Sequence, residues 1–107
     1  MTPLSMENLL SDLKSGLVEL YGDRLNGMYL FGSYARGEQD DESDLDIMVV
    51  LNDYQRYGEE IDRTADLASS LSLNYNVSVS LVFLLTQDWL ESATPLLRNV
   101  RMDAVRA

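Results

Sequence analysis

The sequence predicts an α/β fold in which a small mixed β-sheet is flanked by helices. Two apolar runs, 47–51 and 77–84, have the length and composition of strands. Amphipathic helical patterns precede, separate and follow these runs. The chain has 107 residues and shows no internal repeat or linker, so we expect one domain, 1–107, with a modest core.

The first predicted element is an amphipathic helix from residue 3 to about residue 20. Thr2 is the predicted N-cap, and Pro3 suits the first helical position. Five leucines fall on one helical stripe: Leu9, Leu10, Leu13, Leu17 and Leu20. Gly22 and the Asn26-Gly27 pair are predicted to interrupt the chain before a strand at Met28–Phe31.

The middle of the chain reads as strand, turn and strand. After Phe31, Gly32-Ser33 opens a short helical turn over 34–36, and a charged loop over 38–43 follows it. The apolar run 47–51 then begins directly behind Asp44-Leu45-Asp46.

The second half predicts a helix, a third strand and further helices. A helix over about 54–73, which Asp53 could cap, leads through a turn at 74–76 to the strand 77–84. A short helix is expected to start near Trp89, with Thr86 or Asp88 as its cap. Pro95 opens a last helical segment, whose apolar residues could pack or form an interface: Leu96, Leu97, Val100, Met102 and Val105.

Composition excludes several kinds of chemistry. Without cysteine or histidine, the chain cannot use disulfides, zinc sites or histidine acid–base catalysis. The net charge of −10 argues against direct nucleic-acid binding, because phosphate contacts need clustered Lys and Arg. No apolar run approaches the ~20 residues of a membrane span. Residues 1–10 lack the positively charged region with which a secretory signal peptide begins. We expect a cytoplasmic protein that does not bind membranes.

The stretch from Gly32 to Asp46 contains the candidate site. Side chains alternate across a strand, so Asp44 and Asp46 project from one face while Leu45 and Ile47 turn to the core. Two such carboxylates suit Mg²⁺, which prefers oxygen ligands shared with substrate phosphates. Gly32 lets backbone approach a phosphate, and Ser33 offers a hydroxyl and an N–H at a helix start.

This stretch resembles the signature of the DNA polymerase β-like nucleotidyltransferase superfamily, because Gly32-Ser33 is followed, after ten residues, by Asp44-x-Asp46. In its small size and its sequence GSYARG, the chain resembles the minimal nucleotidyltransferase branch of this superfamily, which includes the MntA antitoxins. The resemblance implies a polymerase β palm-like fold. It implies metal binding and catalysis by Asp44 and Asp46, phosphate binding by Gly32 and Ser33, a catalytic part for Ser33, and support from Arg36.

The sequence lacks a third carboxylate, which superfamily transferases carry on a later strand. The matching segment here is Val79-Ser80-Leu81, so Ser80 stands where the family would have Asp. Ser78 on the same face does not repair the gap, because a hydroxyl is a poor Mg²⁺ ligand and a poor base. The chain then either works with two carboxylates and other ligands, or retains binding with weakened catalysis.

The resemblance implies a Mg²⁺-dependent adenylyltransferase that moves AMP from ATP onto a hydroxyl, and an antitoxin that modifies a tyrosine of a HEPN-type toxin. One alternative is a catalytically weakened subunit that masks its partner by contact. Another is an antibiotic adenylyltransferase whose acceptor pocket would lie across a homodimer.

Overall fold

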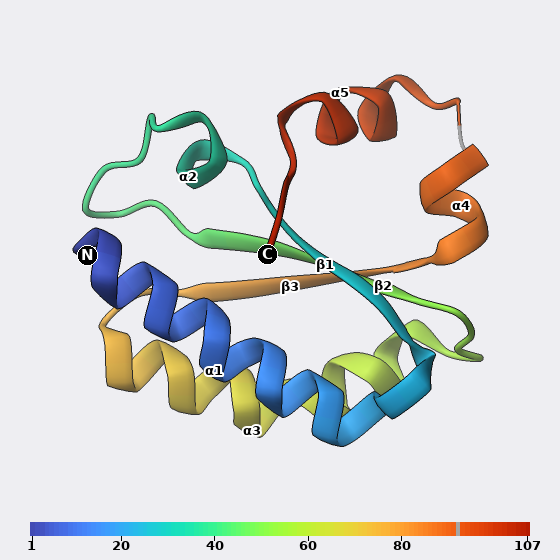
Figure 1. Cartoon of the computed structure of the whole chain (residues 1–107), viewed down its shortest axis with the longest axis horizontal. Helices are drawn as coiled ribbons and strands as arrows, with labels where there is room; N and C mark the ends of the chain where they lie inside the picture. The colour runs from blue at the N-terminus through green and yellow to red at the C-terminus, as the bar shows by residue number, and fades with distance from the viewer. Residues whose placement is uncertain (92) are drawn as a thin grey trace.

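The elements of the computed structural model, which describes residues 1–91 and 93–107, confirm the predicted mixed α/β class (Figure 1). In chain order they are α1 (Pro3–Tyr21), the 3₁₀ helix η1 (Gly22–Arg24), β1 (Leu25–Phe31), α2 (Ser33–Arg36), β2 (Leu45–Leu51), α3 (Tyr57–Tyr75), β3 (Val79–Leu85), α4 (Thr86–Glu91), α5 (Pro95–Asp103) and β4 (Val105–Arg106).

The four strands form one sheet in the order β3-β2-β1-β4. β1 runs antiparallel to β2 and β4, whereas β2 and β3 are parallel. Helices α1 and α3 lie side by side on one face of the sheet, and α4 and α5 lie on the other side (Figure 1). None of the helices in the described part of the chain is both long and apolar enough to cross a membrane.

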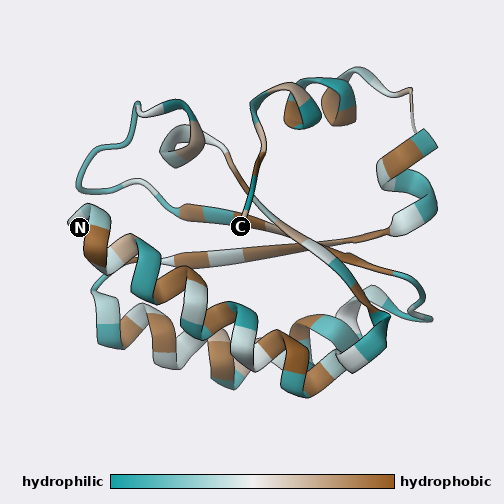
Figure 2. Ribbon diagram, in the orientation of Figure 1, coloured by the Kyte–Doolittle hydropathy of each residue, from teal (hydrophilic) through white to brown (hydrophobic). Residues whose placement is uncertain are grey.

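Strand β2 supplies both halves of the core. Leu45, Ile47, Val49 and Leu51 are fully buried in the cluster that contains the α1 leucines and Phe83 of β3. Met48 and Val50 point the other way, into a smaller cluster with Trp89 of α4. The predicted alternation is therefore confirmed, and Asp46 continues the face of Met48 and Val50 (Figure 2 shows the apolar strands).

Helix α1 begins and ends close to its predicted limits. The Thr2 hydroxyl accepts a hydrogen bond from the Ser5 N–H at 3.1 Å, which confirms the N-cap. Leu9, Leu13 and Leu17 are fully buried. Leu20 is 42% exposed, so the buried stripe is narrower than the leucine pattern suggests.

Two predictions before α3 were wrong. β1 begins at Leu25, so Asn26-Gly27 lies inside the strand, where a register shift between Leu25 and Gly27 accommodates the pair. Asp53 does not cap α3: that helix starts at Tyr57, and the Asp53 carboxylate instead accepts a charged hydrogen bond from Arg24 Nε at 2.7 Å.

The boundaries of α3 and β3 also differ from prediction. α3 continues to Tyr75 and ends at Asn76, which adopts the left-handed conformation that often closes a helix. The strand expected over 77–84 starts two residues later, at Val79.

The outer edge of β3 is covered by hydroxyl groups of α3. The Val79 N–H donates to Ser72 Oγ at 3.0 Å, and the Phe83 N–H donates to Tyr57 Oη at 3.2 Å. These bonds satisfy backbone donors of an edge strand that would otherwise face outward.

After β3, the chain differs from the expected caps and packing. Thr86 opens α4 with its hydroxyl 3.2 Å from the Leu51 carbonyl oxygen, so it anchors the helix to β2 and does not cap it. α5 begins at Pro95 as predicted, with Thr94 as its cap. Strand β4 was not predicted. Some of the apolar side chains expected to pack are exposed: Leu96 (73%), Met102 (83%) and Val105 (53%).

A pair of leucine substitutions tests the orientation of α1. We expect Leu17→Ala to lower the free energy of unfolding by about 2–5 kcal/mol, because it empties space in a sealed core. The matched change Leu20→Ala, on the exposed side of the same helix, should cost about 0.5 kcal/mol or less. Urea denaturation measures both, and equal costs would contradict the described packing.

Candidate functional site

Gly32, between β1 and α2, lies against the side chain of Asp46. Its φ of +77° and ψ of −155° belong to a region that only glycine adopts readily. A Cβ at this position would collide with Asp46 Oδ2 and would lie 3.3 Å from Asp46 Cγ. The main chain of the Gly-Ser turn therefore lies directly against the second carboxylate, as a shared metal and phosphate site would require.

The turn after Gly32 is a single turn of helix, α2. The N–H groups of Ala35 and Arg36 both donate to the Gly32 carbonyl oxygen, at 3.1 and 3.2 Å. The first N–H groups of a helix have no intrahelical acceptor, and in α2 these belong to Ser33 and Tyr34. Gly37 ends the turn in the left-handed conformation, with φ of +71°. The predicted turn is confirmed, and Gly32 at its start lies against Asp46.

The structure brings Asp44 and Asp46 to the start of β2. Asp46 is half-buried within the strand, and Asp44 is exposed just before it. Burial raises the pKa of the Asp46 carboxyl, and the neighbouring Asp44 charge raises this pKa further, whereas the Arg36 cation lowers it. The pair is therefore a concentrated negative site that a cation would relieve.

Arg36 has two acidic partners. Its Nε donates to Glu38 at 3.1 Å, and its Nη1 lies 3.6 Å from Asp103 Oδ2 at the end of α5. Both contacts raise the pKa of Arg36, with Glu38 contributing the larger effect. The Glu38 contact pairs Arg36 with the first acid of the loop that follows α2. The Asp103 contact was missed, because nothing near Asp103 in the sequence marks it.

Two residues flank Asp46 across the sheet. Phe31 pairs with it from β1, and Ser80 pairs with it from β3. Paired residues of parallel strands point to the same face, so Ser80 occupies the expected third position beside Asp46. Within residues 1–91 and 93–107, no group of three or more acidic side chains is arranged to hold a metal ion.

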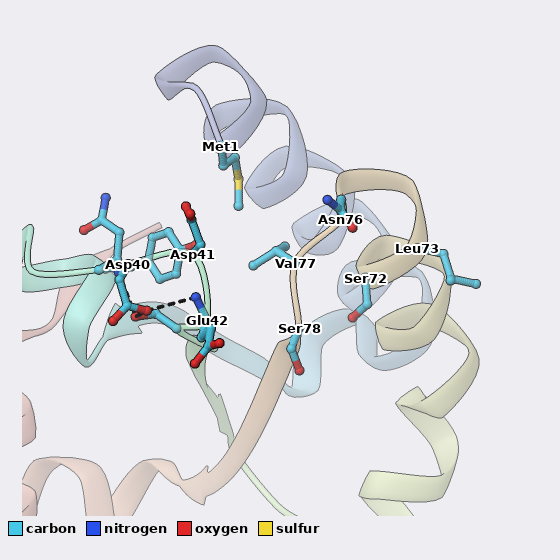
Figure 3. A pocket seen from close by; sticks show the side chains of 12 residues that line it. Met1, Asp40, Asp41, Glu42, Ser72, Leu73, Asn76, Val77 and Ser78 are labelled. Atoms are coloured by element: carbon cyan, nitrogen blue, oxygen red, sulfur yellow. Dashed lines mark hydrogen bonds between the residues drawn. The ribbon is translucent and has the colours of Figure 1, made fainter.

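A cavity of about 690 Å³ lies beside the acidic loop, and neither Gly32 nor Asp46 lines it. Asp40, Asp41 and Glu42 line one side of it, and Val77 and Ser78 line the other (Figure 3). The Glu42 N–H donates to Asp40 Oδ1 at 2.9 Å, which folds the loop back on itself. Three carboxylates would repel a triphosphate, so this cavity does not suit the phosphates of a nucleotide.

Comparisons with known proteins agree with this arrangement. The family model for polymerase beta nucleotidyltransferases matches residues 18–97. MJ0141 of Methanocaldococcus jannaschii, named as a candidate protein adenylyltransferase, is 32% identical over 72 residues, covering 67% of this chain and 72% of the relative. A chain from the crystal structure of a toxin–antitoxin with AMP-PNP is 27% identical, with a TM-score of 0.59 over 89% of this chain and 69% of that chain.

A further solved structure supports the fold alone. It is a candidate minimal nucleotidyltransferase, 24% identical, with a TM-score of 0.67 over 98% of this chain and 95% of that chain. The family match covers most of the present sequence. The chain therefore belongs to the polymerase beta nucleotidyltransferase family, and its structural neighbours include a minimal nucleotidyltransferase and a toxin–antitoxin.

Substitution of the two glycines that flank α2 tests the contact with Asp46. Gly32→Ala should destabilise the protein by about 2–3 kcal/mol, because the new Cβ adds a collision to backbone strain. Gly37→Ala shares the positive φ but meets no neighbouring atom within 4 Å, so it should cost about 1–2 kcal/mol. Thermal unfolding measures both, and divalent-cation binding should be impaired in Gly32→Ala alone.

The raised pKa of Asp46 predicts a trade between stability and cation binding. The folded protein binds a proton at Asp46 more tightly than the unfolded chain does, so the ionised carboxylate costs stability above its folded pKa. Asp46→Asn should therefore raise the Tm of the cation-free protein at neutral pH. The gain should vanish as the pH falls below the unfolded pKa of about 3.9. An unchanged or lowered Tm at neutral pH would contradict this.

Proposed function

We propose that this chain transfers AMP from ATP to a hydroxyl group of a partner protein and releases pyrophosphate. The contact between the Gly32 main chain and the Asp46 carboxylate is the observation that carries the proposal. It joins the turn that suits phosphates to the acids that suit a cation, and phosphoryl transfer relies on both.

In this proposal, Asp44 and Asp46 hold Mg²⁺. Their oxygens are the ligands that this cation prefers. Burial raises the pKa of Asp46 and the Asp44 charge raises this pKa further, so a cation beside the two carboxylates would stabilise the ionised form of Asp46. When bound, Mg²⁺ would neutralise the charge that develops on the phosphates during transfer. Asp44 is exposed and Asp46 lies within the strand, so a Mg²⁺ ion held between the two carboxylates would remain accessible to a nucleotide.

In the same proposal, the turn that starts at Gly32 binds the phosphates of ATP. The N–H groups of Ser33 and Tyr34, together with the Ser33 hydroxyl, would bind the β- and γ-phosphates beside Gly32. Arg36 would support this site from the end of α2, held there by Glu38 and Asp103. The toxin–antitoxin neighbour with AMP-PNP supports an adenine nucleotide as the substrate.

We further propose that the acceptor is a tyrosine of a HEPN-type toxin and that the chain acts as its antitoxin. The toxin–antitoxin neighbour and the relative named as a candidate protein adenylyltransferase support a protein acceptor. The exposed apolar side chains of Leu96 and Met102 on α5 provide a surface on which such a partner could dock.

A second function is favoured by Ser80. Because the residue paired with Asp46 from β3 is a neutral hydroxyl, the chain could bind nucleotide and mask a partner without modifying it. The distinction between the two functions is whether the partner gains mass.

The first test is capture of the partner from native extract, followed by its intact mass with and without Mg·ATP. A captured protein that gains one or more AMP units would support transfer and identify the acceptor. A partner that is held firmly but gains no mass would overturn transfer in favour of masking.

The acid pair can be tested once an acceptor is known. Asp44→Asn or Asp46→Asn should lower the rate of AMP transfer by about 10²-fold or more, because a neutral amide holds the cation poorly. Asp41→Asn is the matched control, since it removes a charge from the exposed loop and should leave the rate nearly unchanged. Full activity in the double variant of Asp44 and Asp46 would refute the assignment.

A further inference from the structure

The surroundings of Asp46 limit how much positive charge the site can hold. Strand pairing puts Phe31 on one side of Asp46 and Ser80 on the other. Neighbouring strands lie about 4.8 Å apart, so these two residues occupy the positions from which a further ligand would reach a cation on Asp46. One is a hydrocarbon and the other is a neutral hydroxyl.

Three other acids, from the loop after α2 and from the end of α5, already have partners. Glu38 and Asp103 both face Arg36, at 3.1 and 3.6 Å, and so offer their charge to the guanidinium. Asp40 accepts hydrogen bonds from the Glu42 N–H and the Ser43 hydroxyl within the acidic loop. Across residues 1–91 and 93–107, no third acid joins Asp44 and Asp46 in a metal-binding group.

Two carboxylates match the needs of a single Mg²⁺. This cation takes six oxygen ligands and is commonly held by one or two carboxylates, with water and substrate phosphates completing the set. A pair of cations at the ~3.5–4 Å spacing of two-metal sites repel each other strongly, so further anionic ligands are needed. Arg36 adds another positive charge beside Asp46 and opposes a second cation.

We propose that this chain holds one divalent cation with its nucleotide, where a third carboxylate would allow two, and that Ser80 sets this limit. The inference rests on the proposed function, since it assumes that Asp44 and Asp46 bind the cation. The carboxylates bind the cation on the phosphate side of Asp46. The side next to Ser80 is left to water or to the acceptor.

Manganese counting tests this inference without any catalysis. The probe is Mn²⁺, titrated into the protein in the presence of an ATP analogue with a methylene group between the α- and β-phosphates. Electron paramagnetic resonance gives the number of ions bound per chain and reports spin coupling between two close ions. The expected result for the unmodified chain is one Mn²⁺ with an uncoupled spectrum.

Two substitutions of Ser80 separate charge from size. Ser80→Asp should bind two Mn²⁺ and show a coupled spectrum, since it places a carboxylate in register with Asp46. Ser80→Asn has nearly the same shape without the charge and should bind one. Circular dichroism confirms that each variant is folded, and the count for the unmodified chain stands even if a variant does not fold.

The outcomes distinguish this inference from the proposed function. Two coupled ions in the unmodified chain would overturn the one-cation limit and leave the proposed function intact. A folded Ser80→Asp that binds a single ion would overturn the role of Ser80. No ion beyond that carried by free nucleotide, with the same result in Asp46→Asn, would overturn the metal assignment itself.

Discussion

The absence of a side chain at Gly32 is the constraint on which the candidate site depends. The main chain can turn from β1 into α2 against Asp46 because no Cβ occupies the space that the carboxylate fills. That contact places the turn against β2, the most buried strand of the sheet. A precise site is thereby built from one helical turn too short to be stable alone.

Much of this arrangement could be read from the sequence, because it rests on local rules. Alternation along residues 45–51 placed Asp46 on the face opposite Leu45 and Ile47, and the Thr2-Pro3 pair marked the start of α1. These features are set by strand and helix periodicity, which a short window of residues already contains. The expectation that Ser80 stands at the third position came from the family resemblance, and the register of β2 with β3 places it beside Asp46.

The features that the sequence did not reveal depend on contacts between distant segments. In the sequence, Asp53 and Thr86 both look like helix caps. In the structure, Asp53 instead accepts a hydrogen bond from Arg24 of η1, and Thr86 donates one to the end of β2. The contact between Arg36 and Asp103 joins α2 to the far end of α5. In each case a polar side chain contacts a partner that is distant in the sequence, and Arg36 does so while also keeping its local partner Glu38. Residue spacing alone cannot predict such contacts.

The hydroxyls of Ser72 and Tyr57 have a consequence for assembly. They occupy backbone donors along the outer edge of β3, and at the opposite border β4 lies against β1. An extended peptide that paired with β3 would have to displace these two hydroxyls, and so would a second copy of the chain that stacked on this edge in a cross-β manner. Recognition of another protein by strand addition is thus opposed at the β3 border of the sheet.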